Sequence, residues 1–423
     1  MTDNIDSIFY ELLQIAIGTR AQLSKKTSAK EWQQLFELSK KQALTAVAFY
    51  GVSKLKEAYP DDNGIGSSIG MPETLYLQWM GLTAKIVQRN WKMNTECSEV
   101  CKELAHDGFR CCVLKGQGNQ EYYPENLQEY RTAGDIDVWC DPYDSIAIAV
   151  GSDKGAEYVE YYGINAIVEY TLMRANIQRK NGNDGWYELG YHHACYMLPS
   201  GIKVELHSRP SWLPSPVRNY TMQRWFKKQM DTQLPGKDYN GFPVPSVGFN
   251  VVFQLTHIFN HLMEEGVGLR QLLDYYMVLR MYHNDLSDLS DHCQSMGQWA
   301  ENMGRSLPSC DEVMHTLSSF GLKKFACALM WVLHEVFAMP ECYMICPANE
   351  REGRFLLDEI MAAGNFGQYD VRINKLHSKS GISRKIGQLK HALRLLNHYP
   401  EETLCTPFRI YHVIWRKFEL WRY

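Results

Sequence analysis

Two aspartates near the middle of the sequence, Asp135 and Asp137, have the type and spacing that chemistry on phosphate groups requires. They lie in the segment GDIDVWCD, whose apolar and β-branched residues predict a strand. Alternate side chains of a strand point to the same side of the sheet, and two residues span roughly 6–7 Å. Carboxylates at this spacing suit Mg²⁺ as oxygen ligands, whereas two unpaired charges would repel each other.

A third acid, Glu205, lies in a later segment that predicts a β-hairpin. Residues 194–198 would form one strand, Pro-Ser-Gly the turn, and residues 202–207 the partner strand. Apolar and polar residues alternate in the second strand, so one face presents Glu205 and His207 together. If the two acidic strands are neighbours, two carboxylates can bridge two Mg²⁺ ions and the third can activate a hydroxyl. Phosphoryl or nucleotidyl transfer needs such an arrangement.

A glycine-containing turn, Lys115-Gly116-Gln117-Gly118, comes shortly before the aspartates and precedes a segment expected to contain a helix. The N–H groups of such a turn and of a helix N-terminus can hold phosphate. Lys115 and Arg131 could add charge-assisted contacts. Each of these signals alone also fits an ordinary turn or a polar strand face. Their order within one α/β segment favours a functional site.

The elements that must position these residues divide the chain into three predicted parts. Residues 1–106 predict a helical region that ends in a long helix from about Glu73 to His106, and residues 107–240 predict an α/β core. Within that core, residues 144–162 could form a helix, whereas residues 164–180 are ambiguous and could be strand-rich. Residues 241–423 predict a second helical domain with an aromatic and basic tail. The predicted fold class is α+β, with a small mixed sheet between two helical regions.

Composition narrows the class of protein and of partner. The 423 residues include 44 basic and 48 acidic ones, for a net charge of −4, so nucleic acid is not favoured as a partner. Twelve cysteines occur without the CxxC spacing of zinc sites, which predicts free thiols in a reducing cytoplasm. The N-terminus lacks the features of a signal peptide, and the longest apolar run, residues 325–333, is too short to span a bilayer. We therefore expect a cytoplasmic protein with no membrane span.

The order of these motifs resembles the nucleotidyltransferase fold of the DNA polymerase beta superfamily. More narrowly, it resembles an uncharacterised bacterial nucleotidyltransferase family. Three motifs carry this resemblance: Leu114-Lys115-Gly116, Arg131 followed by Gly134-Asp135-Ile136-Asp137, and Val204-Glu205-Leu206-His207. The narrower family has Lys-Gly in the first turn, where the wider superfamily commonly has Gly-Ser.

The resemblance implies a nucleotidyltransferase core and a reaction. A nucleoside monophosphate would pass from an NTP, with ATP favoured, to a hydroxyl of a protein or small molecule, and pyrophosphate would leave. The reaction would depend on Mg²⁺, with two metal ions expected. Three acids would bind the metals and carry catalysis: Asp135, Asp137 and Glu205. Glu205 could instead act as the base. Three residues would bind nucleotide: Lys115, Gly116 and Arg131.

Three histidines are expected to line the cleft between the sheet and the C-terminal helices: His207, His257 and His261. The HxxxH spacing of the last two is one that zinc sites also use, and core or surface histidines are a further alternative. Arg270 and Asp274, four residues apart on a predicted helix, predict an ordinary surface salt bridge.

Two other classes of protein remain as alternatives. A catalytically silent nucleotide-binding or partner-binding protein could retain the fold, although the presence of all three acids argues against it. A helical scaffold would leave three convergent acids unexplained, and without a metal these acids would repel one another.

Overall fold

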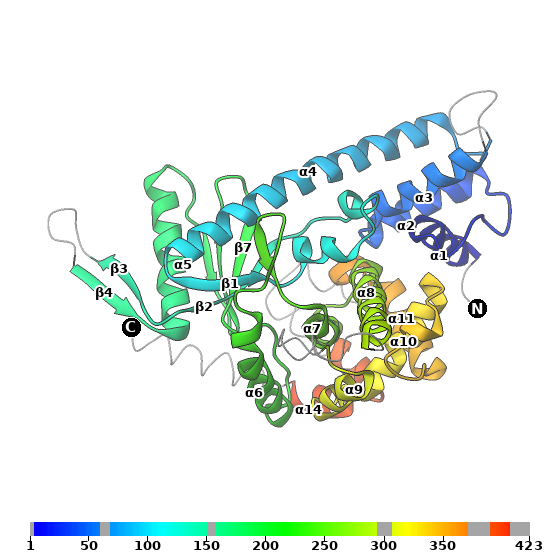
Figure 1. Ribbon diagram of the computed structural model, residues 1–423. Helices are drawn as coiled ribbons and strands as arrows, with labels where there is room; N and C mark the ends of the chain where they lie inside the picture. Colours follow the sequence, from blue (N-terminus) through cyan, green and yellow to red (C-terminus); the bar gives the residue numbers. More distant parts are fainter. Residues whose placement is uncertain (1–3, 60–67, 151–156, 294–306, 371–389, 407–423) are drawn as a thin grey trace. The chain divides into compact units, whose positions relative to one another are not determined.

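The computed structural model describes residues 4–59, 68–150, 157–293, 307–370 and 390–406, and it confirms the predicted α+β class (Figure 1). Contacts group the chain into two units, each drawn from several segments. Unit 1 comprises Met1–Trp91, Gln120–Thr132 and Asn250–His398. Unit 2 comprises Lys92–Asn119, Ala133–Phe249 and Tyr399–Tyr423. The predicted division into three consecutive parts stays a prediction.

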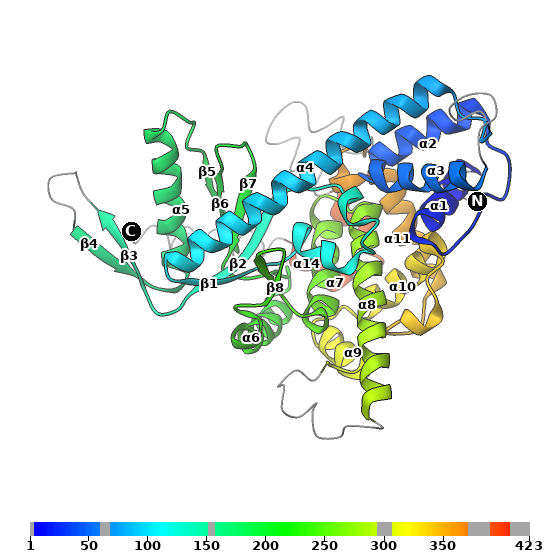
Figure 2. The same cartoon turned by 45° about the horizontal axis from the view of Figure 1, so that its top comes forward.

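A five-stranded mixed sheet forms the centre of unit 2, with its strands side by side in Figure 2. In spatial order the strands are β1 (Phe109–Val113), β2 (Ile136–Pro142), β7 (Lys203–His207), β6 (His193–Met197) and β5 (Tyr187–Leu189). β2 and β7 run parallel, and the other neighbouring pairs are antiparallel. The predicted hairpin is thus confirmed. The predicted strand that carries the two aspartates also forms, but it begins at Ile136 and so includes Asp137 without Asp135.

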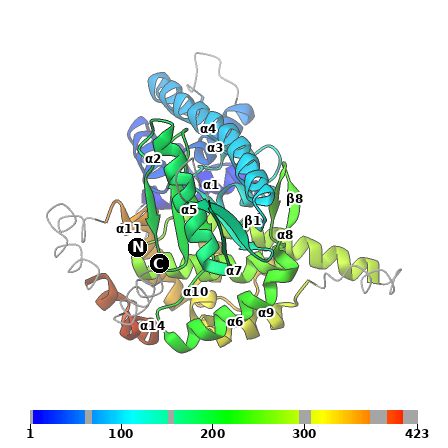
Figure 3. The same cartoon turned by 90° about the vertical axis from the view of Figure 1, so that its left-hand side faces the viewer.

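One face of this sheet is apolar and is covered by helices. Alternate residues such as Val138, Val204 and Leu206 join a buried core with residues of α5 (Gly163–Lys180) and of the last turns of α4 (Glu73–His106). Figure 3 shows α5 running along the sheet. Burial of these side chains fixes which residues of each strand face inward, because side chains alternate between the two faces. The opposite face, called the polar face, carries Asp137, Glu205 and His207 beside the buried Trp139, which stacks on Phe249.

Shorter elements complete unit 2. β3 (Ile146–Val150) and β4 (Glu157–Tyr161) form a two-stranded antiparallel sheet beside α5. β8 (Lys237–Tyr239) and β9 (Phe242–Val244) form another, which packs against β1. Helix α6 (Pro216–Gln233) begins with Ser215 as its N-cap, and α14 (Pro400–Cys405) belongs to the same unit.

Two expectations for the core segment are wrong, and one ambiguous segment is now assigned. Residues 144–162 contain β3 and β4 rather than a helix, because Ile146 and Ile148 alternate into the buried core. Residues 164–180 form helix α5 rather than strands, because its buried residues, such as Ile167, Tyr170 and Thr171, recur at helical spacing. The segment after the first turn forms short 3₁₀ helices, η1 (Gly116–Tyr122) and η2 (Gln128–Tyr130), in place of an α-helix.

Unit 1 is helical, as predicted for both ends of the chain. Its helices are α1 (Asn4–Ile17), α2 (Ala29–Lys41), α3 (Thr45–Ala58), α8 (Leu269–Cys293), α9 (Cys310–Ser319), α10 (Lys323–Phe337), α11 (Glu350–Ala363), most of α7 (Val247–Glu264) and the first part of α4. Helix α1 packs on α3 and α10, and α10 packs on α11. Capping boxes start α2, at Ser28 and Glu31, and α9, at Ser309 and Glu312. The predicted aromatic and basic tail lies outside the described residues.

A buried ion pair joins two segments of unit 1. Nε and Nη2 of Arg131 donate to the two carboxylate oxygens of Asp274, each at 2.7 Å. The hydroxyl of Tyr123 donates to the same carboxylate at 2.8 Å. The expected surface salt bridge between Arg270 and Asp274 is therefore wrong, since both residues are buried and Arg270 donates to the Thr132 carbonyl.

We expect Asp274→Ala to lower the free energy of unfolding by about 3–5 kcal/mol, because Arg131 would remain buried without its counter-ion. Glu350→Ala is the control, because it removes an ion pair with Arg354 in which each side chain is 63% exposed. Such exposed pairs contribute about 0–1 kcal/mol. Denaturant unfolding followed by circular dichroism measures both variants, and equal losses would contradict the assignment of Asp274 as a buried partner.

A second prediction concerns Glu402, whose carboxylate accepts a hydrogen bond from the Ser215 amide at 2.8 Å. Burial is the main cause that raises its pKa from 4.5 to about 7. The folded state thus binds this proton more tightly than the unfolded state does, so stability is lost as the pH rises from about 4.5 to about 7. We expect Glu402→Gln to remove this loss.

The measurement is the difference in unfolding free energy between each variant and the wild-type protein from pH 4 to 8. Glu401→Gln is the control. The hydrogen bond from Arg218 holds the pKa of Glu401 below its usual value, so its contribution should change with pH in the opposite direction. Parallel pH profiles for the two variants would refute the assignment.

Candidate active site

The pairing of two strands brings the predicted acids together. In the parallel register of β2 and β7, Asp137 lies opposite Glu205. Asp135 stands just before the first residue of β2, two positions from Asp137. The ammonium group of Lys203 contacts the Glu205 carboxylate and lies 3.5 Å from Oδ2 of Asp135. The three acids therefore adjoin one another on the polar face of the sheet.

His207 bridges two of these acids. Its Nε2 lies 3.1 Å from Oδ1 of Asp137 and 3.4 Å from Oε2 of Glu205, and its side chain is only 3% exposed. Burial by itself would lower the pKa of His207. The hydrogen bonds and charges of the two carboxylates outweigh burial, so its pKa is raised and the imidazolium form is favoured.

Lys115 supplies a positive charge beside the acids. Nζ of Lys115 lies 3.0 Å from Oδ1 of Asp137. Burial lowers the pKa of Lys115, but the carboxylates of Asp137, Asp135 and Glu205 together raise it above its usual value. Burial raises the pKa of Asp135, and the charge of Asp137 raises it further.

Glu205 differs from Asp135 in the balance of these effects. Burial opposes its ionisation, yet the hydrogen bond with His207 and the charge of Lys115 hold the pKa of Glu205 well below its usual value. Glu205 is thus a carboxylate that needs basic neighbours to remain charged inside the protein.

Two glycines shape the turn that carries Lys115. Gly116 adopts a positive φ of 65°, which favours glycine, and a Cβ at Gly118 would come within 2.5 Å of the Val113 carbonyl oxygen. The amide of Leu114 donates to the Asp137 carbonyl at 2.9 Å and so ties the start of the turn to β2. This backbone geometry places the Lys115 side chain beside the acids.

The donor set on this face is suited to a metal ion. Ligand atoms of Asp137, Glu205 and His207 lie within 4.8 Å of one another. Asp135 adjoins this group through Lys203. Carboxylate oxygens predominate, and Mg²⁺ prefers oxygen ligands.

Three other predicted site residues lie in unit 1. Arg131 is held by Asp274 and by the Thr132 carbonyl. His257 and His261, on α7, approach each other to 2.8 Å through their Nε2 atoms. The described residues form three clusters that could hold a metal, and none includes either of these two histidines. The expected contacts of all three with nucleotide or acceptor stay predictions.

The structure adds three residues that the sequence did not single out for this site: Lys203, His192 and His193. Lys203 precedes Glu205 by two positions in β7, so the alternation of side chains along a strand was the one sequence feature that could have placed it on the same face. His193 lies opposite His207 in the β6–β7 register, so its place depends on the exact hairpin pairing. Burial lowers the pKa of His193 to about 4 and that of His192 well below its usual value, so both imidazoles are neutral.

None of the helices in the described ranges combines the length and the apolar character needed to cross a membrane. Comparisons with curated proteins and with solved structures gave no match. Comparison with protein-family models matched residues 28–300 to a family described as "uncharacterised nucleotidyltransferase". This match covers more than half of the sequence and includes all three acids of the site. The chain therefore belongs to this uncharacterised nucleotidyltransferase family.

Proposed function

We propose that the protein is a Mg²⁺-dependent nucleotidyltransferase that transfers a nucleoside monophosphate from an NTP to a hydroxyl group. The observation that carries the proposal is the register of β2 and β7, which sets Asp137 beside Glu205, with Asp135 adjoining. Membership of a nucleotidyltransferase family supports the same reaction class. We favour ATP as the donor and a protein or small molecule as the acceptor.

Asp135, Asp137 and Glu205 are the residues that would hold the metal, in a two-metal site. When bound, the ions would supply positive charge against the negative charge that develops on the transferring phosphoryl group. Glu205 has a second role open to it. It is the candidate for the base that accepts the proton of the acceptor hydroxyl, and for this role its basic neighbours would have to turn to other partners, because a carboxylate with a strongly lowered pKa is a weak base.

The bonds that change are those at the α-phosphorus of the NTP. The acceptor oxygen loses its proton and bonds to that phosphorus, while the bond to the β-phosphate breaks and pyrophosphate leaves. Lys115 and Gly116 would bind the nucleotide phosphates. Lys115 now pairs with Asp137, and a phosphate oxygen could replace that carboxylate as its partner.

The order of the motifs supports a polymerase-beta-like core for this enzyme. The net charge of −4 disfavours nucleic acid as the acceptor, and the free cysteines suit a reducing cytoplasm. One observation favours the catalytically silent alternative. Lys115, Lys203 and His207 already compensate the three acids, so the polar face is electrostatically balanced by the chain itself.

A first prediction separates the enzyme from the silent protein. We expect Asp135→Asn, Asp137→Asn and Glu205→Gln each to lower pyrophosphate release by about a hundredfold or more, because each removes a carboxylate that would hold the metal ions needed to stabilise the transition state. The assay incubates the protein with Mg²⁺ and labelled NTPs, alone and with cell extract, and follows pyrophosphate and label transfer.

Glu160→Gln, which changes an exposed acid on β4, is the control and should retain full activity. If Asp135→Asn still released pyrophosphate at the wild-type rate, the acids would not take part in the reaction. No release from the wild-type protein with any NTP, despite thermal stabilisation by nucleotide, would support the silent alternative.

A second prediction concerns Lys203, whose ammonium group contacts both Glu205 and Asp135. We expect Lys203→Met to bind Mg²⁺ or Mn²⁺ roughly tenfold more tightly, because it removes a positive charge that repels the metal. Thermal unfolding at increasing metal concentration measures the affinity. Lys180→Met, at the exposed end of α5, should not change the affinity. An unaltered metal response of Lys203→Met would show that Lys203 does not compete with the metal.

A further inference from the structure

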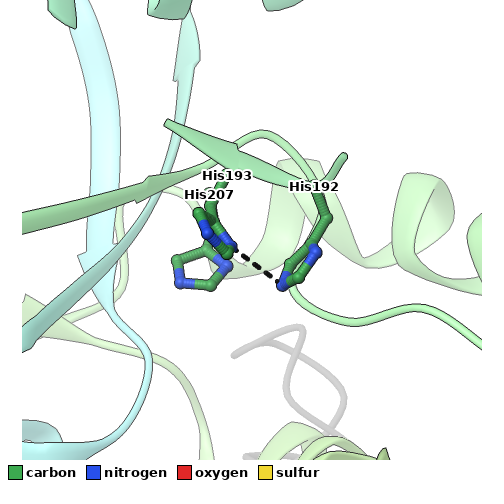
Figure 4. Close-up of side chains that lie close together, drawn as sticks. All are labelled: His192, His193 and His207. Carbon is green, nitrogen blue, oxygen red and sulfur yellow. Dashed lines mark hydrogen bonds between the residues drawn. The ribbon is translucent and has the colours of Figure 1, made fainter. Parts of the chain in front are cut away.

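Three imidazoles, from β7 and from the start of β6, converge on one another (Figure 4). His193 is the first residue of β6 and lies opposite His207 on β7, and His192 immediately precedes it. Nδ1 of His193 and Nε2 of His192 are 3.1 Å apart. One ring nitrogen from each of the three histidines lies within 4.8 Å of the other two. The strand register thus gathers nitrogen donors at one point.

The two nitrogens of His207 have different surroundings. Nε2 is directed at the carboxylates of Asp137 and Glu205. Nδ1 is buried and has no hydrogen-bond partner among the described residues. A histidine that binds a metal through one nitrogen usually donates its other N–H to a carboxylate, which fixes the ring orientation. His207 therefore has the carboxylate half of such an arrangement, and its Nδ1 would bind the metal on releasing the proton that the imidazolium form carries.

We propose that His192, His193 and His207 form a binding site for a borderline divalent cation such as Zn²⁺. This site shares His207 with the neighbouring set of Asp137, Glu205 and His207, but it takes only imidazole nitrogens and does not depend on the nucleotidyltransferase assignment. Imidazole nitrogens suit Zn²⁺, whereas Mg²⁺ prefers oxygen. Bonds of about 2.0–2.1 Å to a tetrahedral Zn²⁺ place neighbouring nitrogens about 3.3 Å apart. His192 and His193 are already close to that separation.

The number of ligands indicates the kind of zinc site. Structural sites are usually closed by four protein ligands, whereas sites with three leave a position for water or a substrate oxygen. Three histidines next to Glu205 match the second kind. An ion bound there would also fix the His207 ring, and through it the carboxylates of Asp137 and Glu205.

A neighbouring set of donors offers an alternative position for the cation. Ligand atoms of His193, Cys195 and Glu205 also lie within 4.8 Å of one another. The two sets share His193 but differ at His192 and Cys195. Variants at these two positions therefore decide which set binds the ion.

The test measures Zn²⁺ binding by the full chain, treated with a chelator and then dialysed against Zn²⁺ alone. We expect one Zn²⁺ per chain, with at least tenfold weaker binding in His192→Ala and in His193→Ala. Cys195→Ala should bind as the wild-type protein does. So should His257→Ala, which changes the other closely paired histidines. Circular dichroism checks that each variant is folded.

Three results would each overturn the proposal. In the first, both histidine variants bind zinc as the wild-type protein does. In the second, Cys195→Ala loses zinc while His192→Ala retains it, and in the third, millimolar Mg²⁺ displaces the zinc. Co²⁺ bound to the unaltered protein gives a measurement that needs no variant. Nitrogen ligation in tetrahedral geometry gives strong visible absorption, whereas the weak absorption of octahedral Co²⁺ would contradict the site.

The zinc proposal and the transfer proposal fail independently. Asp135→Asn should abolish nucleotidyl transfer but leave Zn²⁺ binding intact, because Asp135 lies outside the histidine cluster. Conversely, loss of zinc in His192→Ala tests the cluster without altering any of the three acids.

Discussion

Parallel pairing of β2 with β7 holds Asp137 opposite Glu205, and the polar face of unit 2 depends on this register. A shift by one residue would turn Glu205 and His207 into the apolar core and bring Val204 and Leu206 out of it. The core under α5 and the end of α4 resists such a shift, because those valine and leucine side chains are fully buried. The hydrophobic side of the sheet therefore fixes the chemistry of the other side.

The same face illustrates how buried charges can be tolerated. Each acid has at least one basic group within ion-pair distance, and His207 and Lys203 each contact two acids. Such a network keeps the Glu205 carboxylate ionised despite burial. A ligand that binds to this face must replace some of these ion-pair partners. Binding of metal, phosphate and acceptor would consequently be coupled through the same lysines and histidine.

Sequence patterns predicted the local parts of this arrangement and missed the parts set by distant pairing. The spacing of Asp135 and Asp137 and the alternation around Glu205 were sufficient, because strand periodicity is local. The segment that forms β3 and β4 was misassigned and the segment that forms α5 stayed ambiguous, since short apolar runs fit either structure. The histidine cluster requires the exact β6–β7 register. The pairing of Arg131 with Asp274 joins residues far apart in the sequence, and no local pattern reveals it.

The long chain between β2 and β7 has a kinetic consequence. That chain includes β3, β4, α5, β5 and β6, all of which must be accommodated before the two strands can pair. Closing such a loop costs conformational entropy, and contacts between residues far apart in the sequence form slowly. During synthesis Asp135 and Asp137 leave the ribosome well before Glu205 exists. We expect local hairpins and α5 to form first, so that the three acids meet only as the sheet of unit 2 is completed.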